Sequence, residues 1–86
     1  MDETLQAPIP KAEEITFGMK AVGISFNPGG HADVNIIKQQ CANVIDTLNT
    51  ARSKTDNQDK KRMYSEAITA IQTGQMWGVK AATWQY

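Results

Sequence analysis

The sequence predicts an all-α protein: an antiparallel hairpin of two helices, the second longer than the first, that assembles into a homo-oligomer. Two segments, residues 32–52 and 56–84, carry apolar residues at helical spacing. Only a few residues connect them, so the two helices must run antiparallel. A chain of 86 residues with one cysteine buries only about 60–65% of its unfolded surface and has no internal disulfide. Association with other copies is therefore the expected source of added stability.

The chain is expected to be a single domain over residues 1–86. Residues 1–16 contain two prolines and are expected to form a flexible arm or a short helix. Residues 17–31 are apolar but interrupted by glycines, which predicts an extended segment followed by a turn. In a type II turn, proline takes the second position and glycine, with positive φ, the third. The turn sequence is Asn27-Pro28-Gly29-Gly30.

The first hairpin helix is predicted over residues 32–52. Asp33 is its expected capping or first-turn residue. A heptad series of apolar residues follows, which predicts the face that packs in the hairpin. The series is Val34, Ile37, Cys41, Val44 and Leu48, with Ile45 alongside. Cys41 is therefore expected to be a core thiol and not a reactive one.

The second hairpin helix is predicted over residues 56–84, starting at a capping box in Thr55-Asp56-Asn57-Gln58. It carries a heptad stripe, which we call the seam, and this stripe is expected to face a partner. The seam consists of Met63, Ala67, Ala70, Gly74, Trp77, Ala81 and Trp84. A groove of small residues, Ala70, Gly74, Gly78 and Ala82, runs beside it. Each glycine costs about 1 kcal/mol in a helix, so close packing is expected there, and roughly nine residues should extend past the first helix.

Composition excludes several classes of function. Nine basic and nine acidic side chains give a net charge of zero, which argues against a polymeric nucleic acid partner. No apolar run is long enough for a membrane span. One cysteine and one histidine argue against a metal site, and no cofactor is expected. No nucleophile with a positioned base is visible, so the chain is not expected to be an enzyme.

One constellation points to a ligand: the turn after Phe26, followed by a helix that bears Lys38. An exposed aromatic offers a stacking face for a base. Glycines and a helix N-terminus favour phosphate, and a lysine adds a cation. A plain turn with Lys38 in water explains the same residues, and the two interpretations remain open. His31 is expected to have a structural or solvent role, and the tryptophans to lie in a core or interface.

Several segments also carry a resemblance to a known family. They are residues 21–30, the motifs Val34-x-x-Ile37-Lys38 and Ile45-Asp46-x-Leu48, and the stretch from Ala67-Ile68 through Gln75-Met76-Trp77-x-Val79-Lys80-Ala81-x-Thr83-Trp84. In these segments, over about residues 18–84, the chain resembles the small phage proteins that share the anti-CBASS/anti-Thoeris hairpin domain. CBASS is cyclic-oligonucleotide-based antiphage signalling.

The resemblance implies a non-enzymatic homohexamer that acts as a sponge in the cytoplasm of the infected bacterial host. It would bind cyclic oligonucleotide messengers between subunits, such as 3',3'-cyclic GMP-AMP or a cyclic trinucleotide. By position, Phe26 would stack on a base and Lys38 would contact phosphate, beside Asn27, Pro28, Gly29 and Gly30. Arg62 is a further candidate ligand-binding residue, and whether a second pocket lies near it is left open. The alternatives are an anti-Thoeris-type sponge for cyclic ADP-ribose derivatives and an oligomeric adaptor that binds no small molecule.

Overall fold

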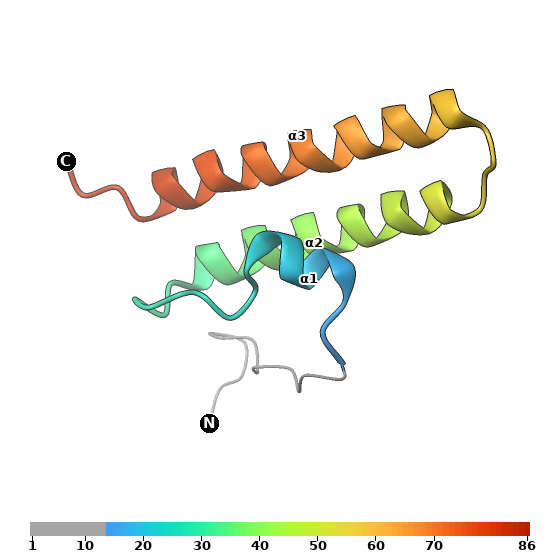
Figure 1. Cartoon of the computed structure of the whole chain (residues 1–86). Helices are drawn as coiled ribbons and strands as arrows, with labels where there is room; N and C mark the ends of the chain where they lie inside the picture. Colours follow the sequence, from blue (N-terminus) through green and yellow to red (C-terminus); the bar gives the residue numbers. More distant parts are fainter. Residues whose placement is uncertain (1–13) are drawn as a thin grey trace.

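Residues 14–86 are described by the computed structural model, and they fold into helices joined by short loops (Figure 1). The helices are α1 (Phe17–Val22), α2 (Ala32–Ser53) and α3 (Gln58–Ala82). α2 and α3 form an antiparallel hairpin, and α1 packs mainly against α2. No strand occurs within residues 14–86. The predicted all-α hairpin is confirmed, whereas the homo-oligomer stays a prediction. Most of the arm predicted for residues 1–16 lies outside the described residues.

The prediction of an extended segment is wrong for residues 17–22, which form α1. The Thr16 hydroxyl accepts a hydrogen bond from the Met19 N–H at 3.1 Å and caps the start of this helix. Gly23 ends it in the left-handed conformation, at φ 61°, and the Ile24 N–H then donates to the Met19 carbonyl at 3.0 Å. Gly23, one of the glycines that interrupt the predicted extended segment, is therefore the C-terminal cap of α1.

Gly18 lets α1 dock closely on α2. Its N–H donates to the Asp46 carboxylate at 2.7 Å. A Cβ at this position would lie 2.1 Å from the Ala42 carbonyl oxygen. Any side chain at residue 18 would therefore push α1 off α2.

The core lies where the three helices meet. Its fully buried members are Val22 of α1, Ala42 and Ile45 of α2, and Ile68 of α3. Cys41 packs against this cluster, as predicted for a core thiol. Because α2 is covered by both α1 and α3, it buries Lys38 and Ala42 in addition to Val34 and Ile45. Ile37, Cys41 and Leu48 of the predicted heptad series are half-buried. Val44, which belongs to that series, is 46% exposed, so the prediction that it packs in the hairpin is wrong.

α2 begins where predicted and ends one residue beyond residue 52. α3 begins two residues later than predicted, because Asn57 caps it: the Asn57 side chain accepts the Lys60 N–H at 3.0 Å. It also ends two residues earlier, at Ala82. The helices have 22 and 25 residues, so the predicted overhang of roughly nine residues is not present.

The seam faces away from α2 in the single chain. Trp77 and Trp84 are 66% and 58% exposed, and a Cβ on Gly74 would meet nothing within 4 Å. A different stripe of α3 packs in the hairpin: Tyr64, Ile68, Ile71, Gln75, Val79 and Ala82 are all partly or fully buried. The placement of the tryptophans in a core is therefore wrong for this chain on its own. The seam is available to a partner.

Candidate functional site

The residues that sequence reasoning grouped around Phe26 lie at one end of the hairpin. The loop between α1 and α2 reaches this end, where α3 also terminates (Figure 1). Phe26 is 72% exposed. A pocket beside it is lined by Phe26, Asn27, Pro28, Gly29, His31, Val34, Val79 and Thr83. The turn, the start of α2 and the end of α3 therefore share one surface.

The Asn27 side chain holds the loop against α2. Its oxygen accepts the His31 N–H at 3.1 Å. Its amide nitrogen donates to the His31 carbonyl at 2.9 Å and to the Asn35 side-chain oxygen at 3.0 Å. With these bonds the side chain uses both amide hydrogens and its oxygen. The Asn27 side chain therefore holds in place the loop that lines the pocket.

The turn closes where predicted but with a different geometry. The Gly30 N–H donates to the Asn27 carbonyl at 2.9 Å, which places Pro28 and Gly29 at the two central positions. Positive φ occurs at Gly30 (62°) and not at Gly29, so the type II prediction is wrong. Gly29 has another use, because a Cβ there would lie 2.5 Å from the His31 ring. Glycine allows that ring to fold over the turn.

The N-terminus of α2 opens beside the turn. His31 is its N-cap residue, but the His31 side chain makes no capping hydrogen bond. Asp33 lies in the first turn, as expected. The first backbone N–H groups of any helix have no partner within it, and with the helix dipole they favour an anion. In this helix the side chain of the N-cap residue, His31, does not occupy those groups.

Lys38 lies under the loop and not in the pocket. The residue is 4% exposed. Its ammonium donates to the Gly23 carbonyl at 2.9 Å and to the Phe26 carbonyl at 2.5 Å. The nitrogen is also 5.4 Å from the centroid of the Phe26 ring. Burial lowers the pKa of Lys38 from the ordinary 10.5.

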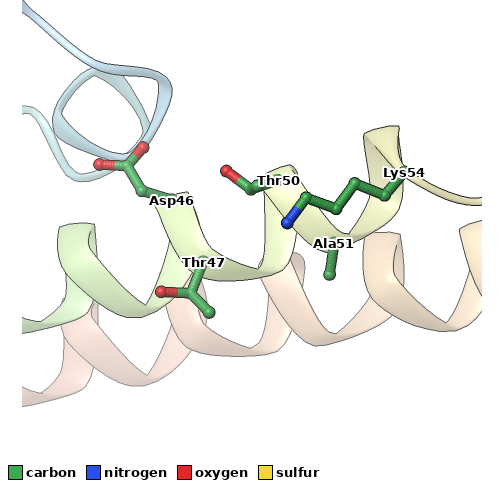
Figure 2. A pocket seen from close by; sticks show the side chains of 5 residues that line it. All are labelled: Asp46, Thr47, Thr50, Ala51 and Lys54. Carbon is green, nitrogen blue, oxygen red and sulfur yellow. The ribbon is translucent and has the colours of Figure 1, made fainter.

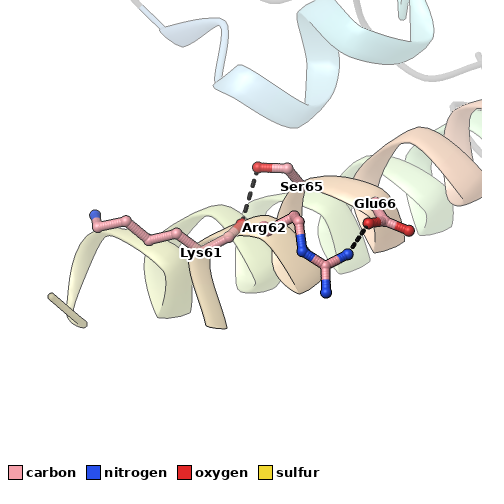
Figure 3. Close-up of polar contacts among 4 residues, drawn as sticks. All are labelled: Lys61, Arg62, Ser65 and Glu66. Carbon is pink, nitrogen blue, oxygen red and sulfur yellow. Dashed lines mark hydrogen bonds and ion pairs between the residues drawn. The ribbon is translucent and has the colours of Figure 1, made fainter. Parts of the chain in front are cut away.

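Arg62 lies near the other end of the hairpin and is not brought to Phe26 within one chain. It forms an ion pair with Glu66, one turn later on α3 (Figure 3). A shallow pocket beside this pair is lined by Arg62, Ser65, Glu66, Thr69 and Ala70. The binding role expected for Arg62 stays a prediction.

Residues 19–83 match the family model described as the Acb2/Tad1 hairpin domain. The chain belongs to the Acb2/Tad1 hairpin family. This is the family of the anti-CBASS and anti-Thoeris sponges, so the resemblance found in the sequence is confirmed. No curated protein and no solved structure matches the chain.

Two further pockets of this Acb2/Tad1 hairpin lie away from Phe26. One lies on α2 and is lined by Asp46, Thr47, Thr50, Ala51 and Lys54, with the Asp46 carboxylate turned toward α1 (Figure 2). The other lies on the seam, between Trp77 and Trp84, with the Lys80 ammonium 5.2 and 5.5 Å from the two ring centroids. Lys80 thus covers part of both indoles.

Residues 14–86 contain no group of three or more metal-ligating side chains. None of the helices described in that range is long and apolar enough to cross a membrane. Within the same range, Arg62 and Glu66 form an ion pair.

Sequence reasoning missed four residues that line the pocket: His31, Val34, Val79 and Thr83. Val79 lies in α3 and Thr83 caps its end, about 50 positions after the turn. The antiparallel arrangement was a usable signal, because it must bring the end of α3 to the start of α2. The predicted overhang instead placed the end of the second helix beyond the start of the first, so this contact was not predicted.

Proposed function

We propose that this member of the Acb2/Tad1 hairpin family is a phage-encoded sponge for cyclic oligonucleotide messengers. It sequesters cyclic dinucleotides such as 3',3'-cyclic GMP-AMP, with cyclic trinucleotides as a second class, in the cytoplasm of the infected bacterium. CBASS effectors are thereby deprived of their activating ligand. The observation that carries this proposal is the 72% exposed Phe26 ring at the edge of a pocket that also contains a helix N-terminus.

Phe26 provides the stacking face for a base. A large exposed aromatic on a loop is costly unless a partner covers it, and base–aromatic stacking is worth about 1–3 kcal/mol. The hydrogen bonds of Asn27 and Gly30 hold the loop in place before a ligand arrives. Little conformational entropy would then be lost on binding.

The start of α2 provides the phosphate site. Its first N–H groups point out of the helix beside Gly29 and Gly30, and its dipole favours negative charge. Glycine at these positions lets a phosphate approach the backbone closely. A zero net charge is compatible with a ligand of two or three phosphates, whereas a nucleic acid polymer requires a basic surface.

A second copy of the chain would complete the site. A cyclic dinucleotide has two bases, and the described lining of this pocket contains one phenylalanine and no other large aromatic. Oligomerisation through the seam, whose tryptophans are exposed, would supply further subunits. We propose a homohexamer, in which messengers bind between subunits.

The proposed activity is sequestration without turnover. A phosphodiester is cleaved by a positioned acid and base or by metal ions. The pocket is lined by apolar, amide, glycine and hydroxyl groups with His31 as the one titratable side chain in its described lining. His31 has no partner base in that lining, so the pocket is suited to binding.

A thermal-shift panel tests this proposal and separates it from its alternatives. The panel contains 3',3'-cyclic GMP-AMP, a cyclic tri-adenylate and cyclic ADP-ribose isomers. A ligand at 100 times its dissociation constant adds about 2.7 kcal/mol, which raises the melting temperature by several degrees. Phe26→Ala is the matched control and should lose most of the shift.

Each alternative has its own outcome. A shift with cyclic ADP-ribose isomers alone favours an anti-Thoeris-type sponge, which belongs to the same family. No shift with any compound contradicts a sponge and favours an adaptor that docks through the exposed seam.

A further inference from the structure

We propose that the seam of α3 pairs antiparallel with the same seam of a second copy of this chain, in the register that brings Glu66 of each copy to Lys80 of the other. This inference rests on the proposed function, because it specifies one subunit contact of the proposed homo-oligomer. The observation behind it is an exposed, uncharged stripe whose large and small side chains are arranged in a self-complementary order.

The exposed side of α3 lacks the charges that usually cover a solvated helix face. Residues 67–79 carry no charged side chain, although this stretch makes about three and a half helical turns. Met63, Met76 and Trp77 are 53%, 64% and 66% exposed. The centres of protein interfaces are depleted of charged residues and enriched in tryptophan and methionine. The seam therefore has the composition of a surface that another protein chain covers.

The order of large and small residues along the seam fits a reversed copy of the same helix. The facing pairs are Ala70 with Gly74, Ala67 with Trp77, and Met63 with Ala81. Each layer of such a contact contains at most one large side chain, so the two backbones can approach closely at the centre. A Cβ on Gly74 would meet nothing within 4 Å in its own chain, which leaves room for this approach. A twofold axis makes each pair occur twice, and the contact is closed.

The charges at the edge of the seam favour the antiparallel orientation. Glu66, Thr73 and Lys80 follow one another at steps of seven residues, so they share one edge of the seam. In an antiparallel pair the same edges of the two helices meet, which brings opposite charges together. In a parallel pair this edge would meet the other edge, where Ile71 and Gly78 carry no charge. Charges that flank a helix seam set the orientation of the partners.

The same two charges select the register. With Ala70 opposite Gly74, Lys80 lies two residues from the position opposite Glu66, which is about 3 Å along the helix. If one copy is displaced by seven residues, large residues still face small ones, but Lys80 lies five residues from that position, about 7.5 Å away. Long side chains bridge the shorter offset more readily, so the first register is favoured.

Both charged groups are accessible in the single chain. The side chains of the Arg62–Glu66 pair are 65% and 66% exposed (Figure 3). A carboxylate has several acceptor sites, so Glu66 can accept from Lys80 of the second copy without leaving Arg62. The Lys80 ammonium lies 5.2 Å from the Trp77 ring centroid, at the border of the surface that the second copy would cover.

The test is free of ligand and uses charge reversal in the full chain, with association measured by analytical ultracentrifugation at low and high salt. The variants are Glu66→Lys, Lys80→Glu and the double variant. We expect each single variant to associate about tenfold more weakly at low salt, because like charges then face each other. The double variant, and an equal mixture of the two single variants, should regain the association of the wild type. High salt should reduce all these differences.

Lys20→Glu is the matched control, because it makes the same charge change at an exposed residue of α1 and should associate like the wild type. Circular dichroism of each variant shows whether its helices are intact. Wild-type association of both single variants would overturn the pairing, as would a double variant and a mixture that both stay dissociated. A wild type that stays monomeric at every concentration would overturn it as well and assign the seam to a different partner.

A fluorescence measurement places Trp77 in the contact. The Trp84→Phe chain keeps Trp77 as its one tryptophan. Its emission should move to shorter wavelength as the protein concentration rises, because association covers an indole that is 66% exposed in the single chain. Association without this change would overturn the pairing.

These results are independent of ligand binding, so the two proposals can fail separately. If the wild type binds no cyclic nucleotide but charge reversal and its restoration behave as expected, the sponge fails and the pairing stands. If cyclic nucleotide binds while both single variants associate like the wild type, the pairing fails and the sponge stands.

Discussion

Gly18→Ala should detach α1 from the hairpin, although the substitution adds only a methyl group. The new Cβ would lie 2.1 Å from the Ala42 carbonyl oxygen and 2.9 Å from Asp46 Oδ1. Overpacking of this kind costs about 1–3 kcal/mol or more. The bond from the Gly18 N–H to Asp46, 2.7 Å long, would also be lost, and hydrogen bonds to charged groups contribute about 1.5–3 kcal/mol. Alanine's helix propensity returns only about 1 kcal/mol.

The expected net effect is a loss of about 2–4 kcal/mol in the free energy of unfolding. For a domain of this size, that lowers the melting temperature by roughly 8 °C or more. Circular dichroism melts of Gly18→Ala and the wild type measure the difference. Gly74→Ala is the matched control, because its Cβ would meet nothing within 4 Å and it should gain about 1 kcal/mol. A melting temperature for Gly18→Ala at or above that of the wild type would refute the described docking of α1.

Three further predictions concern the ligand, the assembly and pH. Phe26→Ala should lower messenger affinity roughly ten- to a hundredfold in calorimetry, while the mass from light scattering stays that of the wild type; full affinity would place the pocket elsewhere. Gly74→Leu should break the oligomer but keep the helical spectrum, since residue 74 faces outward. Gly78→Leu should also destabilise the hairpin, because a Cβ at residue 78 would already be in van der Waals contact with Ile37, at 3.5 Å, and leucine adds further atoms there. A wild-type mass for Gly74→Leu would remove the seam from the interface. Burial lowers the pKa of Lys38 from 10.5 in the folded chain, so just below pH 10.5 the unfolded chain binds more protons than the folded chain. The free energy of unfolding of the wild type should therefore rise toward pH 10.5 relative to that of Lys38→Met. Urea titrations in which the two proteins show the same change of stability with pH would contradict this.

The hairpin was predictable because helical periodicity and a short connection leave few alternatives. α2 and α3 follow from the apolar spacing between Val34 and Ala82, and their ends differ from the predicted ones by one or two residues. α1 was missed because its six residues include a glycine and are too few to show a period. What stabilises it is tertiary: the contact of Gly18 with α2, which the sequence pattern does not reveal.

The face of α3 that packs in the hairpin was also misassigned, for a physical reason. The seam keeps an uninterrupted heptad spacing and contains both tryptophans, so periodicity favours it. The stripe that actually packs on α2 includes Gln75, which is 7% exposed, and Gln72, whose amide donates to the Ala21 carbonyl at 3.2 Å. Gln72 faces inward because α1 offers it a hydrogen-bond acceptor, whereas the Gln75 amide donates to the Gln72 carbonyl of its own helix at 3.5 Å. Hydrophobicity alone cannot anticipate that.

At the site, the exposed Phe26 and the turn at Asn27 were predicted from sequence, whereas the environment of Lys38 was not. A lysine four residues after a buried valine gives no sign that two carbonyls from another segment surround it. The contribution of α3 was hidden in the same way, since Val79 and Thr83 join the pocket only through the hairpin. Contacts between distant segments are what local patterns omit.

The proposed sponge holds a cyclic oligonucleotide without transforming it. The most direct measurement incubates the purified protein with 3',3'-cyclic GMP-AMP, removes unbound ligand by filtration, heats the protein and analyses the released ligand by chromatography. We expect the cyclic messenger to be absent from the filtrate before heating and to be recovered intact afterward. Linear products that depend on the protein would contradict the claim, as would a messenger that passes the filter unbound.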